Sequence, residues 1–550
     1  MILRLLSKVS PLFLALAAFA LPAFAQGACE KLTALQLPNT TITSAAVVPA
    51  GDFKLPPGLV PSIDLPAFCR VQAEIKPTAD SLIKIEVWMP ADSWNGKFEQ
   101  MGNGGLAGSI NLYFLASEMK KGFATAGTDD GHEGQGTDGS WAIGHPEKVK
   151  DFGYRAVHET NVAAKKIIAA FYQKPFRYSY FNGCSEGGRE ALMEAQRFPE
   201  DFDGILAGSA AHYWTQLMAA FAWNAQAMND PAAFLPESKR PAVQKAAVAA
   251  CGMQDGVSDN FIKDPQRCHF DPSVLLCKGA DSDSCLTQPQ VDALKKIYAG
   301  PKNPASGKKI SAGYEPGAEA EPGFPGITFA SYVFGAGPGM SLDSMFSSSF
   351  YGAFVFEDPK WKFSQLNFDQ DIATTEAKVG SILNASNPDL KAFRKHGGKL
   401  IQYHGWNDGS PPPLHSVEYY QSVSAKMGGL ARTQEFYRLF MVPGMMHCGT
   451  GPGPNAFGNM FDLAPAADAD HNIFVSLENW VEKGAAPDRI IATKYNGDSA
   501  ANGVAMTRPI CPFPKQAKWN GKGETSDAAN WTCAAPPLAV KRKPPPSAKP

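Results

Sequence analysis

Short apolar runs that end in turn residues alternate with amphipathic segments over much of the chain. The apolar runs predict buried strands at residues 84–90, 122–132, 177–183, 202–209, 399–405 and 436–442. Apolar residues recur at helical spacing at residues 154–172, 186–198, 416–427 and 473–484. Strands that alternate with helices in this way are typical of a mostly parallel sheet covered by helices, so we predict an α/β fold.

The alternation stops between residues 212 and 384, where Gly, Pro, Ser and aromatic residues are frequent and four cysteines lie close together. A crossover between neighbouring parallel strands needs only about a dozen residues. We therefore predict that this segment is a lid domain inserted into the α/β core. Residues 26–211 and 385–535 then form the first and second parts of that core.

The two ends of the chain differ from the rest. Residues 1–25 combine Arg4 and Lys8 with an apolar run and an Ala-Phe-Ala ending, as in a cleavable secretory signal. The run is shorter than the roughly 20 residues of a membrane-spanning helix, which favours a signal over an anchor. We expect cleavage after Ala25 and a secreted or periplasmic protein without a membrane anchor. Residues 536–550 are basic and Pro-rich and predict a disordered tail, because they offer almost nothing to bury.

The charge balance argues against a nucleic-acid partner. The full chain carries 51 Lys and Arg against 53 Asp and Glu. Loss of Arg4 and Lys8 with the signal leaves 49 against 53, a net charge of about −4. The basic excess of nucleic-acid-binding proteins is missing.

All ten cysteines follow residue 25, and an even number in an exported chain indicates disulfides. None is spaced Cys-x-x-Cys, which argues against zinc-ribbon and thioredoxin-like sites. Closeness in sequence favours the pairs Cys29 with Cys69, Cys251 with Cys268, Cys277 with Cys285, and Cys511 with Cys533. Cys184 and Cys448 would then remain, but even eight cysteines allow on the order of a hundred connectivities, so other pairings stay open.

Residues 181–190 read FNGCSEGGRE, in which Gly183, Ser185 and Gly187 have the spacing of a nucleophile elbow. In such an elbow a strand turns sharply into a helix, and small neighbours let the backbone bend. A predicted strand before the motif and a predicted helix after it fit this geometry. Ser185 is therefore a candidate nucleophile, with an ordinary turn residue as the alternative, and Cys184 lies directly before it.

A serine becomes a good nucleophile when a base takes its proton and a carboxylate orients that base, and α/β-hydrolases supply these groups in the chain order Ser, Asp or Glu, His. Asp408 and His447 each follow a predicted strand, and catalytic groups gather at that edge of a parallel sheet. We therefore predict a triad of Ser185, His447 and Asp408. His404 and His415 flank Asp408 and are the alternative bases. A capping role for Asp408 and a surface role for His447 are the non-catalytic alternatives.

Ser185 preceded by Cys184, an aspartate after the lid, and His447 followed by Cys448 resemble the Cys-Ser, Asp, His-Cys arrangement of the tannase and feruloyl esterase family. The resemblance covers nearly the whole mature chain, and its motifs here are GCSEGGRE, YHG with Asp408, and VPGMMHC. It implies an α/β-hydrolase fold with a large inserted lid domain. It also implies five disulfides in the pairing favoured above, including a bond between Cys184 and Cys448.

The chemistry of this family needs two backbone donors for the oxyanion that forms during ester cleavage. One is expected at the N–H of Glu186, directly after the nucleophile. The other is expected in the Gly-rich loop at residues 99–109, where Gly105 matches the family's donor position. A flexible turn without this role is the alternative for the loop.

Residues 251–268 resemble the family's calcium loop. Calcium prefers several oxygen ligands, and the resemblance implies that Ca²⁺ is held by the carboxylates of Asp255 and Asp259 and the carbonyls of Val257 and Phe261. The chain departs from the family pattern at Gly252, where an acidic residue often follows the first cysteine. A disulfide-stapled polar loop without metal is the alternative.

The resemblance implies a secreted serine carboxylic-ester hydrolase that cleaves feruloyl- or galloyl-type aromatic esters through an acyl-enzyme. A hydrolase of terephthalate monoesters (MHETase-like) and a catalytically silent polyphenol-binding module are the alternatives. The only arginines of the lid are Arg240 and Arg267, neither at the position where the terephthalate monoester hydrolase of the family grips its substrate carboxylate, so a neutral aromatic ester is favoured. Lys360, as a point charge, is the alternative cation for such a carboxylate. The aromatic-rich segments at 329–340 and 347–361 are expected to offer rings and hydroxyls to the acyl group.

Overall fold

A computed structural model describes residues 27–536 of the chain, except residues 57–59, 254–255, 324–325 and 463. The predicted signal, residues 537–550 of the predicted tail, and the predicted calcium ligand Asp255 lie outside the described residues.

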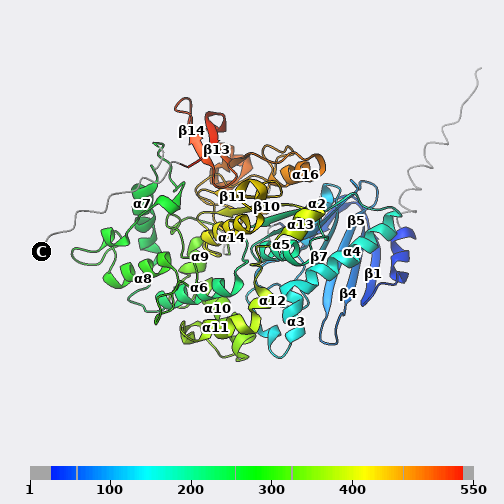
Figure 1. Ribbon diagram of the computed structural model, residues 1–550, viewed down its shortest axis with the longest axis horizontal. Helices are drawn as coiled ribbons and strands as arrows, with labels where there is room; N and C mark the ends of the chain where they lie inside the picture. Colours follow the sequence, from blue (N-terminus) through cyan, green and yellow to red (C-terminus); the bar gives the residue numbers. More distant parts are fainter. Residues whose placement is uncertain (1–26, 57–59, 254–255, 324–325, 463, 537–550) are drawn as a thin grey trace, which may run out of the picture.

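A nine-stranded sheet with the order β1-β4-β5-β7-β6-β8-β9-β10-β11 forms the centre of the protein (Figure 1). Its strands are β1 (Thr40–Val48), β4 (Phe68–Ile75), β5 (Ile83–Pro90), β6 (Lys97–Met101), β7 (Ala124–Thr128), β8 (Tyr178–Cys184), β9 (Gly204–Gly208), β10 (Lys399–Gly405) and β11 (Tyr437–Val442). The strands from β7 to β11 run parallel, as predicted. The strands β1, β4 and β5 form an antiparallel extension. Strand β5 matches the strand predicted at residues 84–90, but its antiparallel pairing and the strands β1 and β4 were not predicted, because alternation along one strand does not reveal its partner. The parallel strand β6 was also not predicted, since its sequence KFEQM is largely polar.

Helices cover both faces of the parallel strands, which explains why those strands are buried at almost every position. Phe181, Ile205 and Leu400 pack on one face with residues of α4, α5 and α14. Tyr180 and Leu206, each one position away along its strand, pack on the other face with residues of α16. The helices of this core are α2 (Leu112–Lys120), α3 (Pro146–Lys150), α4 (Ala156–Tyr172), α5 (Glu186–Arg197), α13 (Lys391–His396), α14 (Pro413–Met427), α15 (Leu430–Thr433) and α16 (Ile473–Lys483).

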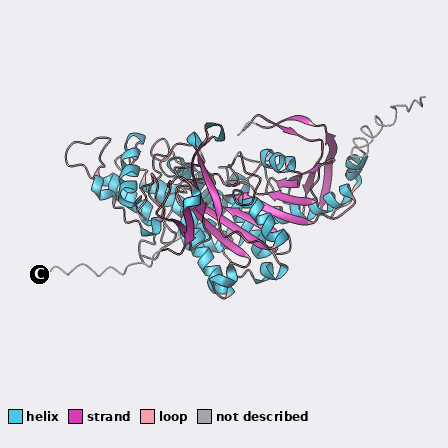
Figure 2. Cartoon of the chain, turned by 90° about the horizontal axis from the view of Figure 1, so that it is seen from above, coloured by secondary structure: helices cyan, strands magenta, loops and turns pink. Residues whose placement is uncertain are grey.

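The segment between β9 and β10 is largely helical and lies at one end of the sheet (Figures 1 and 2). Its α-helices are α6 (Trp214–Ala227), α7 (Arg240–Cys251), α8 (Gln288–Ala299), α9 (Phe329–Val333), α10 (Leu342–Phe350), α11 (Asp371–Thr375) and α12 (Ser381–Leu383). None of its described residues joins the central sheet. Many rings of the two aromatic-rich segments, among them Phe334, Phe350 and Tyr351, are fully buried in the apolar core of this lid. Those rings stabilise the lid, which differs from the expectation that the segments as a whole face a substrate.

Three small two-stranded sheets complete the fold. They pair β2 (Gly51–Lys54) with β3 (Ser62–Leu65), β12 (Ile490–Tyr495) with β13 (Val504–Ile510), and β14 (Gln516–Trp519) with β15 (Trp531–Ala534). The C-terminal pairs lie close to the edge strand β11, where Phe440 forms a bridge with Pro512. No helix among the described residues is long and apolar enough to cross a bilayer.

The ten cysteines form five disulfides, which confirms the predicted pairing. The bonds are Cys29–Cys69, Cys184–Cys448, Cys251–Cys268, Cys277–Cys285 and Cys511–Cys533. Four of them close loops of 40 residues or fewer, whereas Cys184–Cys448 joins positions 264 residues apart. This long-range bond spans the lid insertion.

The lengths of these loops predict unequal contributions to stability. We expect replacement of Cys184 and Cys448 by serine to lower the free energy of unfolding by about 3 kcal/mol more than replacement of Cys277 and Cys285, because cross-linking a longer loop removes more entropy from the unfolded chain. Guanidinium unfolding of the two double variants, followed by circular dichroism, measures the difference. Equal midpoints and slopes in the two variants would contradict this account.

Candidate active site

The backbone at Ser185 has the geometry of a nucleophile elbow. Strand β8 ends at Cys184 and helix α5 begins at Glu186, so Ser185 is the single residue between them. Its φ of 67° and ψ of −118° are strained for a residue with a side chain. A Cβ atom at Gly183 would lie 2.4 Å from the carbonyl oxygen of Gly187, which explains why the turn needs glycine there.

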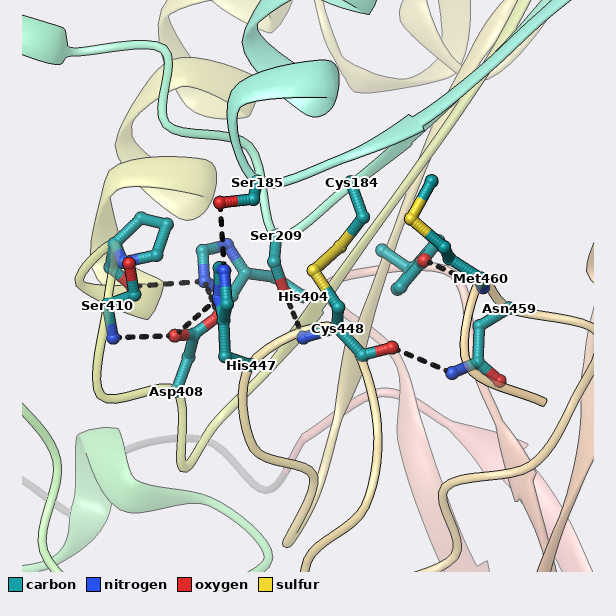
Figure 3. The surroundings of a disulfide bond; sticks show 12 residues. Cys184, Ser185, Ser209, His404, Asp408, Ser410, His447, Cys448, Asn459 and Met460 are labelled. Carbon is teal, nitrogen blue, oxygen red and sulfur yellow. Dashed lines mark hydrogen bonds and ion pairs between the residues drawn. A yellow bond between two sulfur atoms is a disulfide. The ribbon is translucent and has the colours of Figure 1, made fainter. Parts of the chain in front are cut away.

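The three residues predicted as a triad lie in one hydrogen-bonded row (Figure 3). His447 Nε2 lies 2.8 Å from Ser185 Oγ, and His447 Nδ1 lies 2.9 and 3.0 Å from the two carboxylate oxygens of Asp408. Asp408 is fully buried and His447 is 3% exposed, whereas Ser185 is partly exposed. The imidazole can therefore accept the serine proton at one nitrogen while the other nitrogen donates to a carboxylate, as a serine nucleophile requires.

His404, one of the alternative bases, lies on the far side of Asp408. Its Nε2 is 3.2 Å from Asp408 Oδ2 and 3.1 Å from the carbonyl oxygen of Pro411. Its Nδ1 lies 2.6 Å from the hydroxyl of Ser416, which also accepts a hydrogen bond from Gln402. The Ser416 hydroxyl can then donate its proton to His404 Nδ1. This assigns the His404 proton to Nε2, which can donate it to Asp408.

The second alternative base, His415, forms a hydrogen bond with a residue of the lid. Its Nε2 lies 2.8 Å from the hydroxyl of Ser311, a residue of the lid. Burial lowers the pKa of His415 well below its usual value, so this side chain is neutral. Of the two alternatives, only His404 contacts Asp408, and the histidine that contacts Ser185 is His447.

Asp408 is held as a carboxylate despite its burial. Burial alone would raise the pKa of this side chain, but the facing His447 and His404 outweigh it and hold the pKa below its usual value. The backbone N–H of Ser410 donates a further hydrogen bond of 2.8 Å to Asp408 Oδ1. The negative charge needed to orient His447 is thus present at neutral pH.

The Cys184–Cys448 disulfide lies directly beside this row (Figure 3). It joins the residue before Ser185 to the residue after His447, with 6.0 Å between the two Cα atoms. The backbone of Cys448 is held on both sides, since its N–H donates to Ser209 Oγ at 3.3 Å and its carbonyl accepts from Asn459 Nδ2 at 2.9 Å. These contacts limit how far the serine and the histidine can move apart.

The predicted oxyanion donors are backbone groups of two neighbouring segments. Glu186 is the first residue of α5, and the first N–H groups of a helix have no partner within the helix. Gly105 has a φ of 62°, and a Cβ atom there would lie 2.3 Å from the carbonyl oxygen of Gly136. Only glycine fits this position, because the loop packs closely against the next loop of the chain.

A buried cluster of carboxyl groups under the elbow was not predicted from the sequence. Carboxyl oxygens of Asp130, Glu186 and Glu190 lie within 4.8 Å of one another, and Arg189 forms an ion pair with Glu186. Burial, as the main cause, raises the pKa of all three carboxyl groups well above the usual values. Glu190 also accepts a 3.0 Å hydrogen bond from the N–H of Asn103 and thereby anchors the loop that contains Gly105.

The lid approaches the triad through two residues. The ring of Tyr332 lies 5.4 Å from the His447 ring in an edge-to-face arrangement, and the backbone N–H of His447 donates to the carbonyl oxygen of Ile327 at 3.3 Å. Tyr332 belongs to an aromatic-rich segment noted in the sequence, but periodicity could not distinguish it from its buried neighbours.

The described residues of the predicted calcium loop are closely packed. Val257, Asp259 and Phe261 are buried within the loop that Cys251 and Cys268 close. Asp259 forms ion pairs with Lys263 and Arg508, and the Val257 carbonyl accepts a hydrogen bond from Lys263. Metal binding by this loop stays a prediction at this point.

Comparisons with known proteins agree with this geometry. The family described as tannase and feruloyl esterase matches residues 69–534. The chain is 43% identical to an uncharacterised esterase of Xanthomonas campestris pv. campestris over 95% of this chain and 94% of the relative. It is 32% identical to a probable feruloyl esterase B-2 of Aspergillus terreus over 91% of this chain and 93% of the relative.

Solved structures give the same result. Feruloyl esterase B from Aspergillus oryzae superposes with a TM-score of 0.84 and 30% identity, covering 93% of this chain and all of that one. A tannin acyl hydrolase from Aspergillus niger superposes with a TM-score of 0.73 and 22% identity over 94% of each chain, which supports the α/β-hydrolase fold. The match over most of the chain and the shared fold show that this protein is a carboxylic ester hydrolase of the tannase and feruloyl esterase family.

Proposed function

We propose that this chain is an exported serine esterase that cleaves neutral esters of aromatic acids, of the feruloyl or galloyl type, through a covalent acyl-enzyme. The observation that carries the proposal is the row of hydrogen bonds from Ser185 through His447 to Asp408, with 2.8 Å between Ser185 Oγ and His447 Nε2. The names of the relatives, feruloyl esterase and tannin acyl hydrolase, support the aromatic acyl class.

In the proposed reaction Ser185 Oγ attacks the ester carbonyl while His447 Nε2 takes the hydroxyl proton. The proton then passes from His447 to the alcohol oxygen as the carbon–oxygen bond breaks, which leaves the acyl group on Ser185. A water molecule attacks that acyl group with His447 again as the base, and the acid leaves as Ser185 regains its proton. Asp408 stabilises the positive charge on His447 in both steps without being protonated.

The proposed oxyanion hole consists of the N–H groups of Glu186 and Gly105. Donors fixed by the fold stabilise the developing negative charge without first reorganising, and losing one such donor typically costs about 100-fold or more in rate. The hydrogen bond from Asn103 to Glu190 supports this arrangement, since it ties the Gly105 loop to the helix that begins at Glu186. The raised pKa of Asp130 and of Glu190 favours their neutral forms and so reduces the negative charge near the oxyanion.

Both lid arginines already have partners within the protein, which supports a neutral substrate. Arg240 is buried, donates to the carbonyl oxygens of Leu235 and Gly335, and stacks on Phe334. Arg267 pairs with Asp264. A carboxylate-bearing substrate, such as a terephthalate monoester, would need a cation that is free to reach it. This reasoning ranks the terephthalate monoester hydrolase second among the functions.

Export is proposed from the predicted signal and from the five disulfides, which persist in oxidising compartments. The catalytically silent polyphenol-binding module is set aside, because the chain belongs to a family of ester hydrolases. The reactivity of Ser185 tests the proposed catalytic role directly.

The first prediction concerns that reactivity. We expect a fluorophosphonate probe to label the purified protein at Ser185 and nowhere else, because Ser185 is partly exposed and has a base 2.8 Å away. Ser311 and Ser416 also contact histidines, but both are buried and out of reach of the probe. Ser185→Ala should lose labelling and about 1,000-fold or more of the hydrolysis rate. The exposed Ser282→Ala serves as the control and should keep both. A Ser185→Ala protein that hydrolyses esters at more than a tenth of the normal rate would refute the proposal.

The second prediction concerns His404. We expect His404→Leu to lower kcat by about 10- to 100-fold with little change in KM, since the variant loses a hydrogen bond to a buried charge. His404→Gln places an amide N–H near the Nε2 position and should restore most of the rate. The rates are normalised to the fraction of protein that the fluorophosphonate labels. His415→Leu, which changes a histidine that does not contact Asp408, is the control.

Equal losses in the Leu and Gln variants of His404 would mean that the side chain only fills space.

The third prediction concerns the acyl group. We expect kcat/KM to be higher for methyl ferulate or methyl gallate than for a terephthalate monoester measured at the same neutral pH. The physical reason is that burying an unpaired carboxylate costs free energy that no free lid arginine offsets. The opposite order would overturn the substrate assignment and leave the role of Ser185 untouched.

A further inference from the structure

The loop at residues 251–268 contains a buried lysine where the family resemblance implies a metal. Lys263 Nζ lies 2.8 Å from the Val257 carbonyl oxygen and 3.1 Å from Asp259 Oδ2. These oxygens are two of the four ligands expected for Ca²⁺. The Lys263 side chain is only 12% exposed and the Asp259 side chain 5% exposed. An ammonium group thus already contacts two of the oxygens that a calcium ion would need.

A second cation reaches the same carboxylate. Arg508, in strand β13, places two guanidinium nitrogens 3.3 Å from the two oxygens of Asp259. Its guanidinium also stacks on Trp531 at 3.6 Å and donates to the carbonyl oxygen of Thr525. Asp259 is therefore balanced by two positive side chains, and a divalent cation beside them would meet repulsion from both.

The close packing around the backbone of Gly252 is a further argument against a calcium site in this loop. A Cβ atom at Gly252 would lie 2.7 Å from the carbonyl oxygen of Val248 and 3.0 Å from that of Asp259. The acidic residue that the family often carries here would therefore require the backbone to shift. Among the described ligands, Asp259 and the Val257 carbonyl already contact cationic side chains, whereas calcium needs about six to eight oxygens at roughly 2.4 Å.

We infer that in this protein the ammonium of Lys263 takes the structural place of the calcium ion. Both would hold the loop by drawing a carboxylate and a backbone carbonyl toward one positive centre. A singly charged ammonium needs fewer carboxylate partners than a divalent cation. The presence of glycine rather than an acidic residue at position 252 agrees with this. The loop is then joined to the C-terminal region through Asp259 and Arg508, close to the Cys511–Cys533 disulfide.

The inference makes the stability of the lid independent of calcium. We expect the mature protein, after treatment with a chelator and dialysis, to contain less than about 0.1 calcium per chain by atomic emission, and its melting temperature to stay unchanged in millimolar calcium chloride. One calcium per chain, or a calcium-dependent rise in melting temperature, would overturn the inference.

Substitution of the lysine tests its structural role. Lys263→Gln should lower the melting temperature by about 4 °C or more, because a buried carboxylate loses a partner. Lys263→Arg keeps a cation and should lose less. The control is Lys295→Gln, which removes an exposed ion pair with Asp271 in the same lid and should change the melting temperature by less than about 1 °C. Equal effects of Lys263→Gln and Lys295→Gln would refute the structural role. If Lys263→Gln does not fold, the calcium measurements on the natural sequence still decide the inference.

Discussion

The covalent bond between Cys184 and Cys448 is the constraint on which the active-site geometry rests. Ser185 follows β8 and His447 follows β11, and two further strands, β9 and β10, lie between them in the sheet. The serine and the histidine therefore meet only if the loops after these strands fold over the strand ends. The disulfide fixes the neighbours of both residues 6.0 Å apart, measured between Cα atoms. A misplacement of about 1 Å in such a pair can cost ~100-fold in rate, so holding the two residues in place helps to maintain the reaction rate.

Backbone packing around the elbow supplies the second part of this constraint. Ser185 keeps a strained conformation because the surrounding backbone holds it from both sides. Its N–H donates to the carbonyl oxygen of Gly208, and its own carbonyl accepts from the N–H of Ala211. Below the elbow, Glu190 ties α5 to the loop that carries Gly105. The candidate nucleophile and the proposed oxyanion donors are thus connected by hydrogen bonds at the end of the sheet.

Neighbouring positive or hydrogen-bonding groups stabilise a buried carboxylate at two distant places in the molecule. At the triad, Asp408 is stabilised by two histidines and a backbone N–H, which keeps a buried carboxylate ionised. In the lid, Asp259 is stabilised by Lys263 and Arg508. A buried carboxylate must be paired or protonated, and the fully buried Asp130 under the elbow, with its raised pKa, illustrates the second solution.

The sequence by itself determined the parallel strands β7 to β11 other than β6, the helices α4, α5, α14 and α16, the elbow at Ser185 and the order of the candidate triad, because these depend on local periodicity and on short motifs. Closeness along the chain also suggested four disulfides, and elimination left Cys184 with Cys448. The antiparallel pairing of β1, β4 and β5, the contact of His404 with Asp408, and the meeting of Lys263 with Asp259 and Arg508 were decided only by the tertiary structure. Strand pairing and side-chain contacts depend on direction and distance in space, and a pattern read along the chain contains neither.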